Sequence, residues 1–204
     1  MKRIYIVRHG ETEWNLRGKT QGIKDSKLTQ LGRQQGGLLA SRLLDENIGV
    51  IYSSMLKRAS STAKIINKKL KLPLYYNVNL NEINFGLWEG LTNNQIIKKY
   101  PKEFQLWREA PQKVRIPNGE ELSTAQKRIV AFVDLLIEDC NINRILLVSH
   151  SSIIKLLLLN ILGMNLSGYY RLKIENASLN IIEFRHYGPL LLNYNDTYHI
   201  KYHN

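Results

Sequence analysis

The sequence predicts an α/β fold, a three-layer sandwich in which a mostly parallel central sheet has helices on both faces. Two observations support this prediction. Short runs rich in apolar and β-branched residues, at 3–7, 49–52 and 144–149, indicate buried strands. Each run is followed by a stretch with apolar residues at helical spacing. Ligands of such sheets bind at the carboxyl ends of the strands.

The predicted elements of the first half are a strand at 3–7, a helix at 29–44, a strand at 49–52 and a helix that runs to about residue 70. The first strand stops at Arg8-His9-Gly10, so a charged pair lies at its carboxyl end. Thr29 is the expected N-cap of the first helix, and Ser53 or Ser54 that of the second. Arg58 lies in the first turns of the second helix.

The predicted elements of the second half are an irregular helical segment at 92–116, a helix at 120–138, a strand at 144–149, a helix that ends near residue 159, and strands at 178–184 and 190–192. Pro101 and Pro111 interrupt the irregular segment, which we interpret as a helical lid. The strand at 144–149 ends at His150. We therefore expect His9, Arg58 and His150 to meet at the ligand-binding edge of the sheet.

The composition is that of an ordinary globular protein, with 44% hydrophobic and 23% charged residues. A length of 204 residues suits one domain, spanning 1–204. The sole cysteine, Cys140, excludes an intrachain disulfide and a cysteine-built zinc cage, and we interpret it as a buried apolar residue. The four-residue apolar run before Arg8 is too short for a signal peptide or a spanning helix. We expect a cytoplasmic protein without membrane partners.

The formal net charge is +12, from 29 Lys and Arg against 17 Asp and Glu. Such a charge fits a nucleic-acid binder when the cations share one face. The lysines are instead scattered along the sequence, and we interpret their largest cluster as the solvated end of a helix. We therefore expect no nucleic-acid partner and interpret the charge as a field that attracts small anionic substrates.

Residues at the strand ends could together transfer a phosphoryl group, which requires a nucleophile, cations around the phosphate oxygens and an acid for the leaving oxygen. His9 can attack phosphorus when it is neutral, with its other ring nitrogen donating, most simply to a backbone carbonyl. Gly10 would let the backbone come that close. Arg8 and Arg58 can bind phosphate oxygens as forks, and His150, if protonated, adds a charged donor.

Two glutamates of the segment 80–90 are candidates for the acid. Either Glu82 or Glu89 can donate a proton to the leaving alcohol and later take one from water. The spacing of residues leaves the choice between them open.

Taken together, the motifs resemble those of the histidine phosphatase superfamily, the group that contains the cofactor-dependent phosphoglycerate mutases. The opening motif is Arg8-His9-Gly10-Glu11-Thr12 after a strand, with Asn15, Gln21-Gly22, Leu28-Thr29 and Gly32 downstream. Further matches are residues 53–59 with 62–63, Glu82 with 86–90, 117–120, Val148-Ser149-His150, Asn176-Ala177-Ser178 and 195–199. The resemblance spans nearly the whole chain.

The resemblance implies a phosphoglycerate mutase-like fold in which His9 is phosphorylated and Glu82 is the acid and base. The residues that it assigns to phosphate binding are Arg8, Asn15, Arg58 and His150. Gln21 and Gly22, together with the backbone after His150, would line the substrate side. Glu89 is then interpreted as a carboxylate at a helix start. No metal and no cofactor is implied.

The sequence departs from the family pattern in two places. Ser151-Ser152 follows His150 where glycine is most common, and Asn118-Gly119-Glu120-Glu121 replaces Gly-Gly-Glu-Ser. Ser151 keeps its backbone N–H for phosphate binding at a helix N-terminus. Its hydroxyl either adds a donor or caps the helix, and we favour the cap. Neither change removes a reacting group, so we expect an effect on substrate shape only.

The residues after Glu82 favour hydrolysis over transfer. In the mutases this stretch carries an arginine and other polar substrate contacts, whereas here it reads Ile83, Asn84 and Phe85. Loss of one cation for a bound anion forfeits roughly 1.5–3 kcal/mol. We predict a phosphomonoester hydrolase for a small phosphorylated metabolite of the phosphoserine, α-ribazole phosphate or sugar phosphate type. A cofactor-dependent phosphoglycerate mutase is the alternative, and a catalytically silent regulator is a third reading.

The remaining aromatic and histidine residues receive structural interpretations. Aromatic residues at helical spacing, expected to pack in the core or the lid, are Tyr100, Phe104 and Trp107. Histidines expected to be surface or structural, because no carboxylate or cysteine lies at metal-binding spacing, are His186, His199 and His203. Tyr169-Tyr170 is left open between a homodimer contact and a sheet edge.

Overall fold

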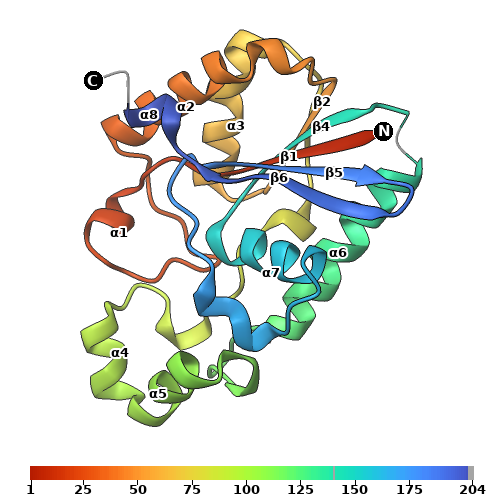
Figure 1. Ribbon diagram of the computed structural model, residues 1–204. Coiled ribbons are helices and arrows are strands. Elements are labelled where there is room, and N and C mark those ends of the chain that lie inside the picture. The colour runs from red at the N-terminus through yellow and green to blue at the C-terminus, as the bar shows by residue number, and fades with distance from the viewer. Residues whose placement is uncertain (140, 202–204) are drawn as a thin grey trace.

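The computed structural model describes residues 1–139 and 141–201, so the expectations for Cys140 and His203 lie outside the described residues. Its centre is a six-stranded sheet with the order β3-β2-β4-β1-β5-β6 (Figure 1). The strands are β1 (Lys2–Arg8), β2 (Val50–Ser53), β3 (Leu74–Tyr76), β4 (Arg144–Ser149), β5 (Leu179–Arg185) and β6 (Gly188–Asp196). The first four are parallel, whereas β5 pairs antiparallel with β1 and β6 antiparallel with β5. The α/β fold class is confirmed, with a mixed sheet.

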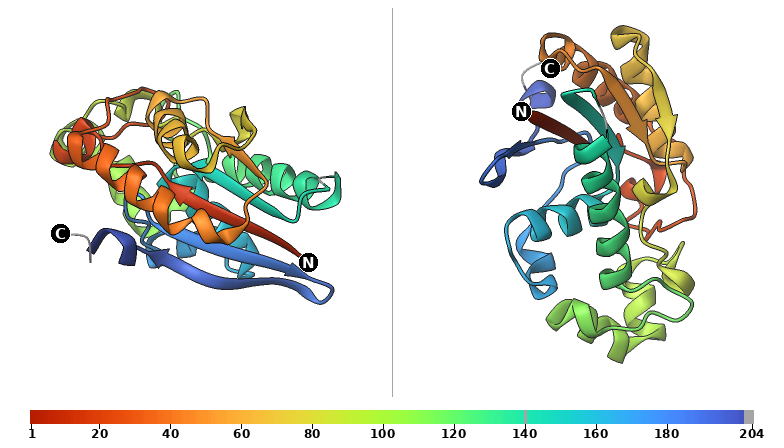
Figure 2. Two further views of the ribbon diagram at one scale, coloured as in Figure 1. Left: turned by 90° about the horizontal axis from the view of Figure 1, so that it is seen from above. Right: turned by 90° about the vertical axis from the view of Figure 1, so that its right-hand side faces the viewer.

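Helices cover both faces of this sheet (Figure 2). The α-helices are α1 (Glu13–Leu16), α2 (Gln30–Arg42), α3 (Lys57–Leu70), α4 (Asn93–Lys99), α5 (Pro101–Glu109), α6 (Leu122–Asp139), α7 (Ser151–Ile161) and α8 (Tyr198–Lys201). The short 3-10 helices are η1 (Leu44–Glu46), η2 (Val78–Leu80), η3 (Gly86–Trp88), η4 (Pro111–Lys113) and η5 (Leu166–Arg171). None of the described helices has the length and apolar character needed to cross a membrane.

Alternation along the strands produces two apolar cores. In β1, Ile4 and Ile6 pack with α6 and α7, while Tyr5 and Val7 pack with α2 and α3. Successive residues of a strand point to opposite faces, so a fully apolar strand needs cover on both sides. The layers of helix, sheet and helix follow from this pattern.

The helix starts differ in part from the sequence-based expectation. Thr29 caps α2 as predicted, because its side chain accepts from the Gly32 N–H. The N-cap of α3 is Leu56 instead of a serine, since Ser54 still belongs to the segment that leaves β2. The N-cap of α7 is His150, and Ser151 is its first helical residue. The favoured role of Ser151 as the helix cap is therefore wrong.

Some elements were not predicted because their local pattern is weak. Strand β3 has only three residues, of which Tyr75 and Tyr76 are exposed. Helix α1 is a single turn, held by a capping box between Thr12 and Asn15. Strand β6 extends over nine residues, well beyond the predicted 190–192. Pairing with β5 defines this edge strand, because most of its side chains are at least partly exposed.

The segment 92–116 contains α4, α5 and η4, and lies below the sheet in the view of Figure 1. Both prolines act as the sequence indicates, since Pro101 begins α5 and Pro111 begins η4. Trp107 of α5 is buried and packs against Phe85 and Trp88. This aromatic packing joins the segment to the loop that follows Glu82.

Candidate active site

The parallel register of β1 and β4 places two histidines side by side. Arg8 at the end of β1 is paired with Ser149 at the end of β4. The next residue of each chain segment is a histidine, and the ring centres of His9 and His150 are 5.2 Å apart. Both side chains are buried, with 2% and 0% exposure. The structure thus brings together the two histidines that the sequence singles out.

His9 has one ring nitrogen held by the backbone. Its Nδ1 lies 2.8 Å from the carbonyl oxygen of Gly10. Because a carbonyl only accepts, Nδ1 carries the hydrogen of the neutral ring and Nε2 keeps its lone pair. Burial lowers the pKa of His9 well below its ordinary value, and the Arg58 and Arg8 guanidinium groups add to this effect. His9 therefore presents a neutral, nucleophilic nitrogen.

His150 has the opposite proton arrangement. Asn81 Oδ1 accepts from the backbone N–H of Met55, which fixes the orientation of the amide. The Ser54 hydroxyl donates to the same oxygen at 2.8 Å, so Ser54 Oγ can only accept from His150 Nε2, also 2.8 Å away. Neutral His150 thus carries its hydrogen on Nε2. Burial, followed by the Arg58 charge, lowers the pKa of His150 well below its ordinary value.

Arg8 and Arg58 each use part of their guanidinium group to hold a loop. Arg8 donates through Nη1 to the carbonyl oxygen of Ile174 at 2.7 Å. Arg58 donates through Nη1 to Asp25 at 3.0 Å and through Nη2 to the Gly22 carbonyl at 2.6 Å. The Nε atom of each arginine is buried and has no partner among the described residues. The edge formed by Nε and Nη2 therefore retains donors for an oxyanion.

Three buried nitrogens around the histidines, namely Arg8 Nε, Arg58 Nε and His150 Nδ1, lack a partner in the part of the chain that the structure describes. Buried polar groups are nearly always hydrogen-bonded. Burial lowers the pKa of both guanidinium groups, and the charge of Glu82 is the largest effect that raises it. Arginine nevertheless stays protonated near neutral pH. The two buried guanidinium groups with their free Nε donors are complementary to a compact oxyanion such as phosphate, and His150 Nδ1 becomes a further donor once it is protonated.

Asn15 and Gln21 both lie against Thr12. Asn15 Oδ1 accepts from the backbone N–H of Thr12 at 3.1 Å, so the amide NH₂ of Asn15 remains a donor. Gln21 is buried, with Oε1 3.1 Å from Thr12 Oγ1. Gly22 has a φ of +59°, and its carbonyl is the oxygen bound by Arg58. Gly22 therefore shapes the loop and positions Arg58.

Glu82 is buried in the loop after η2 and lies against the first turn of α7. Its Oε1 accepts from the Ile83 N–H at 3.0 Å, and its Oε2 lies 3.4 Å from the Ser152 N–H. Its charge acts on both arginines, since it raises the pKa of Arg8 and of Arg58. Ser151 is the adjacent, half-buried residue of the same helical turn. A carboxyl group is thus available next to the oxyanion site.

Glu89 has a different, structural role. It accepts from the backbone N–H of Ile23 at 2.7 Å, of Phe85 at 3.1 Å and of Lys24 at 3.3 Å. It follows η3 and does not begin a helix, so the expected interaction with a helix start is wrong. A Cβ on Gly22 would lie 1.9 Å from Glu89 Oε1. Glu89 ties the loop around Gly22 to the loop around Phe85.

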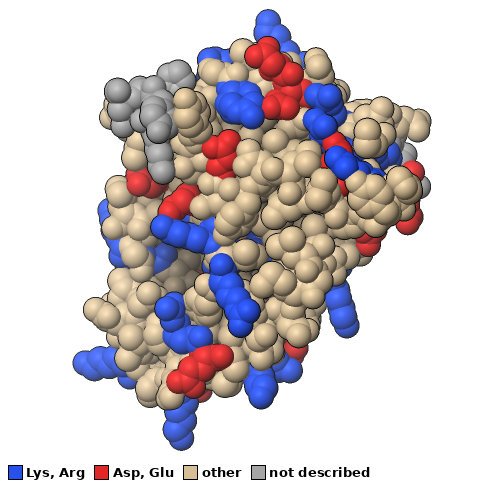
Figure 3. All heavy atoms as spheres, in the orientation of Figure 1, with Lys and Arg blue, Asp and Glu red and all other residues tan. Residues whose placement is uncertain are grey.

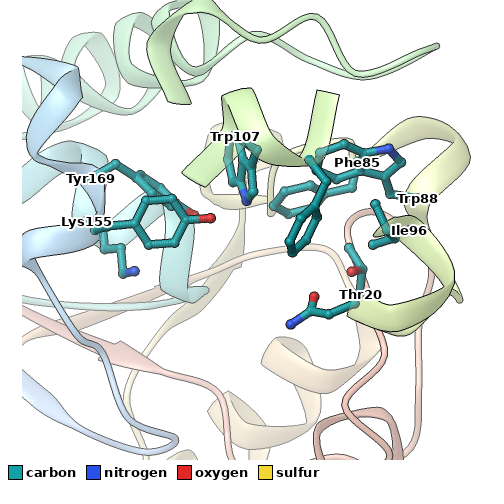
Figure 4. A pocket seen from close by; sticks show the side chains of 10 residues that line it. Thr20, Phe85, Trp88, Ile96, Trp107, Lys155 and Tyr169 are labelled. Carbon is teal, nitrogen blue, oxygen red and sulfur yellow. The ribbon is translucent and has the colours of Figure 1, made fainter. Parts of the chain in front are cut away.

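A cavity of about 170 Å³ connects to these groups through Tyr169 (Figure 4). The Tyr169 hydroxyl donates to Ser152 Oγ at 2.8 Å, and Ser152 is the residue whose N–H faces Glu82. The residues that line the cavity and are labelled in the figure include Thr20, Phe85, Trp88, Trp107, Lys155 and Tyr169. Lys155 and Tyr169 face Phe85 and Trp88 across the opening. Figure 3 shows a hollow bordered by basic side chains between the sheet and the α4–α5 segment.

Sequence reasoning missed most of this cavity. Trp107 and Phe104 do pack as predicted, yet both also line the cavity. Tyr169 and Tyr170 belong to η5, so the sheet-edge alternative for this pair is wrong. The missed signal was Lys155, a charged residue within an otherwise apolar helical run and four residues after Ser151.

The histidines away from the site are structural or exposed. His199 is buried, with Nε2 3.1 Å from the Ala177 carbonyl. His186 is exposed and its ring packs edge-on against Tyr187. Within residues 1–139 and 141–201, no three His, Cys, Asp or Glu side chains are grouped so that they could hold a metal ion.

Comparison with known families agrees with this geometry. The model of the histidine phosphatase superfamily (branch 1) matches residues 4–197. The chain belongs to this superfamily. The resemblance of the motifs is thereby confirmed, and in this histidine phosphatase His9 and Gly10 directly follow β1.

Two curated relatives cover almost all of this histidine phosphatase. Phosphoserine phosphatase 1 of Hydrogenobacter thermophilus is 33% identical over 200 residues, which is 98% of this chain and 95% of the relative. A probable phosphoglycerate mutase of Yersinia pestis is 36% identical over 189 residues, 91% of this chain and 86% of the relative. Sequence identity alone therefore does not distinguish a phosphatase from a mutase, because relatives of both names are similarly identical to this chain.

Solved structures share the whole architecture. YhfR of Bacillus stearothermophilus has a TM-score of 0.94 at 30% identity and covers 98% of this chain and 100% of its own. Phosphoserine phosphatase of Entamoeba histolytica, in complex with phosphoserine, has a TM-score of 0.87 at 31% identity, with 98% and 100% coverage. A putative α-ribazole-5′-P phosphatase of Escherichia coli has a TM-score of 0.88 at 26% identity, with 96% coverage of both chains. The protein is a phosphatase of this superfamily.

Proposed function

We propose that this histidine phosphatase hydrolyses phosphomonoesters of small metabolites through a phosphohistidine at His9. The observation that carries the proposal is the neutral imidazole of His9, held at Nδ1 by Gly10, beside buried arginine nitrogens that have no partner among the described residues. Relatives named as phosphoserine and α-ribazole phosphatases support a small metabolite as the substrate. Phosphoserine, α-ribazole phosphate and sugar phosphates are the substrate types that we propose.

In the first step, His9 Nε2 attacks the phosphorus and the bond from phosphorus to the ester oxygen breaks. Arg8 and Arg58 bind the non-bridging oxygens through their Nε–Nη2 edges, with the amide of Asn15 as a further donor. Protonated Glu82 gives its proton to the leaving oxygen, which departs as a neutral alcohol. His150 takes up a proton from solvent on Nδ1 when the phosphate binds, because its Nε2–H is already committed to Ser54, and it releases this proton when inorganic phosphate leaves.

In the second step, water attacks the phosphohistidine. Glu82, now a carboxylate, accepts a proton from this water, and the bond between phosphorus and Nε2 breaks. Inorganic phosphate leaves and His9 returns to its neutral form. The backbone N–H of Ser151, at the first position of α7, is proposed as an additional donor to phosphate. Gln21 is proposed to contact the substrate, together with Gly22.

Water is the proposed acceptor because the leaving-group side holds few cations. A phosphoglycerate mutase must hold a carboxylate and a second phosphate in either orientation. The residues after Glu82 supply none of the positive charge this needs, since Ile83 is buried and Phe85 lines the cavity. Phe85, Trp88 and Trp107 make one wall largely aromatic. These walls favour release of the product over its return to the phosphohistidine.

We further propose that residues 92–116 act as a lid over the leaving group, within a single domain that spans 1–204. Phe104 and Trp107 of this segment line the cavity, and this supports the assignment. A lid of this kind would exclude bulk water during the first step.

Metal-independent chemistry in the cytoplasm is also part of the proposal. The residues named above account for each proton and charge of both steps. A single cysteine in the sequence suits a reducing compartment. On the face shown in Figure 3, Lys and Arg side chains are dispersed among acidic ones, which favours small anions over nucleic acid as partners.

A substrate panel tests the proposed function. The panel contains phosphoserine, α-ribazole phosphate, fructose 6-phosphate and 3-phosphoglycerate, the last with and without a bisphosphate primer. We expect phosphate release from at least one of these esters, without metal, and release from 3-phosphoglycerate faster than its isomerisation. Isomerisation faster than phosphate release would overturn the proposal in favour of a mutase. No turnover of any ester would favour a silent regulator.

A further inference from the structure

Lys155 is an unpaired ammonium group on the wall of the cavity. It lies one turn after the start of α7, between the buried Ile154 and Leu156. Its Nζ is 4.5 Å from the ring centre of Tyr169 and 5.7 Å from that of Tyr170. No carboxylate among residues 1–139 and 141–201 forms an ion pair with it. The tyrosine rings are therefore its close contacts, and no carboxylate of the described residues lies within ion-pair distance.

The position of Lys155 relates it to both the cavity and the reacting groups. Figure 4 shows Lys155 beside Tyr169, opposite Phe85. Glu82 raises the pKa of Lys155 and Arg8 lowers it, so the ammonium lies within electrostatic reach of the proton donor and of a phosphate ligand. A leaving group bound next to Glu82 would extend toward this ammonium.

The chemistry of the cavity selects an anion of small size. Burial lowers the pKa of Lys155 to about 8 because the ammonium group is partly removed from water. A bound anion would stabilise this half-buried charge. A volume of about 170 Å³ lies below the usual range for drug-sized ligands. One ammonium group suits one carboxylate, whereas a second phosphate would call for more cations.

We propose that Lys155 binds a carboxylate of the leaving group, so that the enzyme prefers small phosphomonoesters that carry a carboxylate a few bonds from the ester oxygen. This inference rests on the proposed function and names its substrate class. Lys155 contacts the part of the substrate that departs. The phosphate itself is bound by Arg8 and Arg58.

Matched substrate pairs test the preference directly. 3-Phosphoglycerate and glycerol 3-phosphate differ by a carboxylate against a hydroxymethyl group, and phosphoserine and phosphoethanolamine differ by one carboxylate. In the wild type we expect kcat/KM to be at least about 10-fold higher for the carboxylate member of a pair, the contribution of one charge-assisted hydrogen bond. Equal values within both pairs would overturn the role of Lys155. No hydrolysis of these four esters together with turnover of α-ribazole phosphate or a sugar phosphate would overturn the carboxylate preference, whereas no turnover of any ester would overturn the proposed function.

Substitution then assigns the preference to this residue. In Lys155→Met the kcat/KM ratio within each pair should fall to about 1, chiefly through a higher KM for the ester with a carboxylate. The kcat/KM for the ester without a carboxylate should stay near its wild-type value. Lys155→Arg should keep most of the ratio. Lys64→Met, which removes an exposed lysine of α3, is the matched control and should leave the ratio unchanged. An equal loss for both members in Lys155→Met would mean that Lys155 binds the transferred phosphate, and would overturn the proposal.

The pH dependence of the wild type gives a test that needs no variant. The charged and titratable groups facing Lys155 are Glu82, Arg8 of β1, Arg108 of α5 and the two tyrosines of η5. Loss of the ammonium charge above about pH 8 should lower the kcat/KM ratio within a pair toward 1 between pH 7 and pH 10. A ratio that stays constant over this range would contradict carboxylate binding by Lys155.

Discussion

His9 and His150 are buried imidazoles with ring centres 5.2 Å apart, yet they hold their protons on different nitrogens. Gly10 accepts from Nδ1 of His9, whereas Ser54 accepts from Nε2 of His150. One ring is thereby prepared as a nucleophile. The other has a free lone pair on Nδ1 that must be protonated before it can donate to phosphate. At this scale each function follows from a single hydrogen bond.

The tautomer of His150 is the first prediction. In the wild type, ¹⁵N NMR of the imidazole should show the Nε2–H form, because Ser54 and Asn81 leave no other arrangement. Ser54→Ala removes the acceptor and should lower kcat/KM about 5-fold for every phosphomonoester, since one hydrogen bond contributes about 1 kcal/mol. Ser60→Ala, in the first turn of α3, is the control and should retain activity. A wild-type His150 with its hydrogen on Nδ1 would contradict the assignment.

The choice between Glu82 and Glu89 is the second prediction. Glu82→Gln cannot protonate the leaving oxygen, so kcat should fall about 10²–10⁴-fold for alkyl phosphates. The loss should be much smaller for p-nitrophenyl phosphate, whose leaving group departs without a proton. Glu89→Gln should show no such dependence on the leaving group and should lower the free energy of unfolding by about 1–2 kcal/mol, because it weakens three backbone contacts. The reverse pattern would assign the acid to Glu89.

At the scale of elements, the loop after β1 is positioned by close packing on the first turn of α2. A Cβ on Gly10 would lie 2.3 Å from the Gly32 carbonyl oxygen, and a Cβ on Gly32 would lie 2.1 Å from the Glu11 carbonyl oxygen. Two backbones can approach this closely only without side chains. The loop holds His9 in place between β1 and α2 because both positions are glycine.

Two glycine substitutions test this packing. Gly10→Ala should lower the free energy of unfolding by roughly 1–3 kcal/mol and reduce turnover, since the loop that carries His9 must shift. Gly37→Ala, within α2 and with open space at its Cβ, should raise that free energy by up to about 1 kcal/mol. Urea unfolding of both variants provides the comparison. Equal stability of the Gly10 variant and the wild type would show that the loop tolerates a side chain.

The elements that the sequence predicted are those whose pattern is local. Strands β1 and β4 each have an unbroken apolar centre, at 4–7 and 145–148, and helix α2 has Thr29 as its cap. Strand β3 escaped prediction because it is short and largely exposed, and it is defined by its pairing with β2. The site shows the same difference between residues with a local sequence pattern and contacts between distant parts of the chain. His9, Arg58 and His150 follow strands, whereas the contact of Ser54 with Asn81 spans 27 positions and has no local sign.

At the scale of the whole molecule, burial of two imidazoles makes stability depend on pH. The pKa values of His9 and His150 are lower in the folded protein than the ordinary value near 6.5. Below about pH 6.5 the unfolded chain binds more protons than the folded one, so the stabilisation present above this pH is lost as the pH falls. Acidic pH should therefore destabilise the fold before the carboxylates titrate.

Urea unfolding between pH 7.5 and pH 5 measures this effect. We expect the free energy of unfolding to fall below pH 6.5 by up to roughly 1.4 kcal/mol per pH unit for each buried imidazole. The slope should be smaller in His150→Gln, which keeps a polar side chain but cannot titrate. His186→Gln, at an exposed position, should retain the wild-type slope. A wild type with constant stability across this range would mean that the two histidines bind protons in the folded protein as they do in the unfolded chain, and would contradict the lowered pKa values.

Direct detection of phosphohistidine tests the central claim, nucleophilic attack by His9. The wild type is mixed with a ³²P-labelled phosphomonoester, quenched in alkali within one turnover and digested. We expect a label that is stable in alkali and lost in acid, located on the peptide that contains His9, and absent in His9→Ala, while His186→Ala retains it. Label on another residue, or hydrolysis that persists in His9→Ala, would contradict nucleophilic attack by His9.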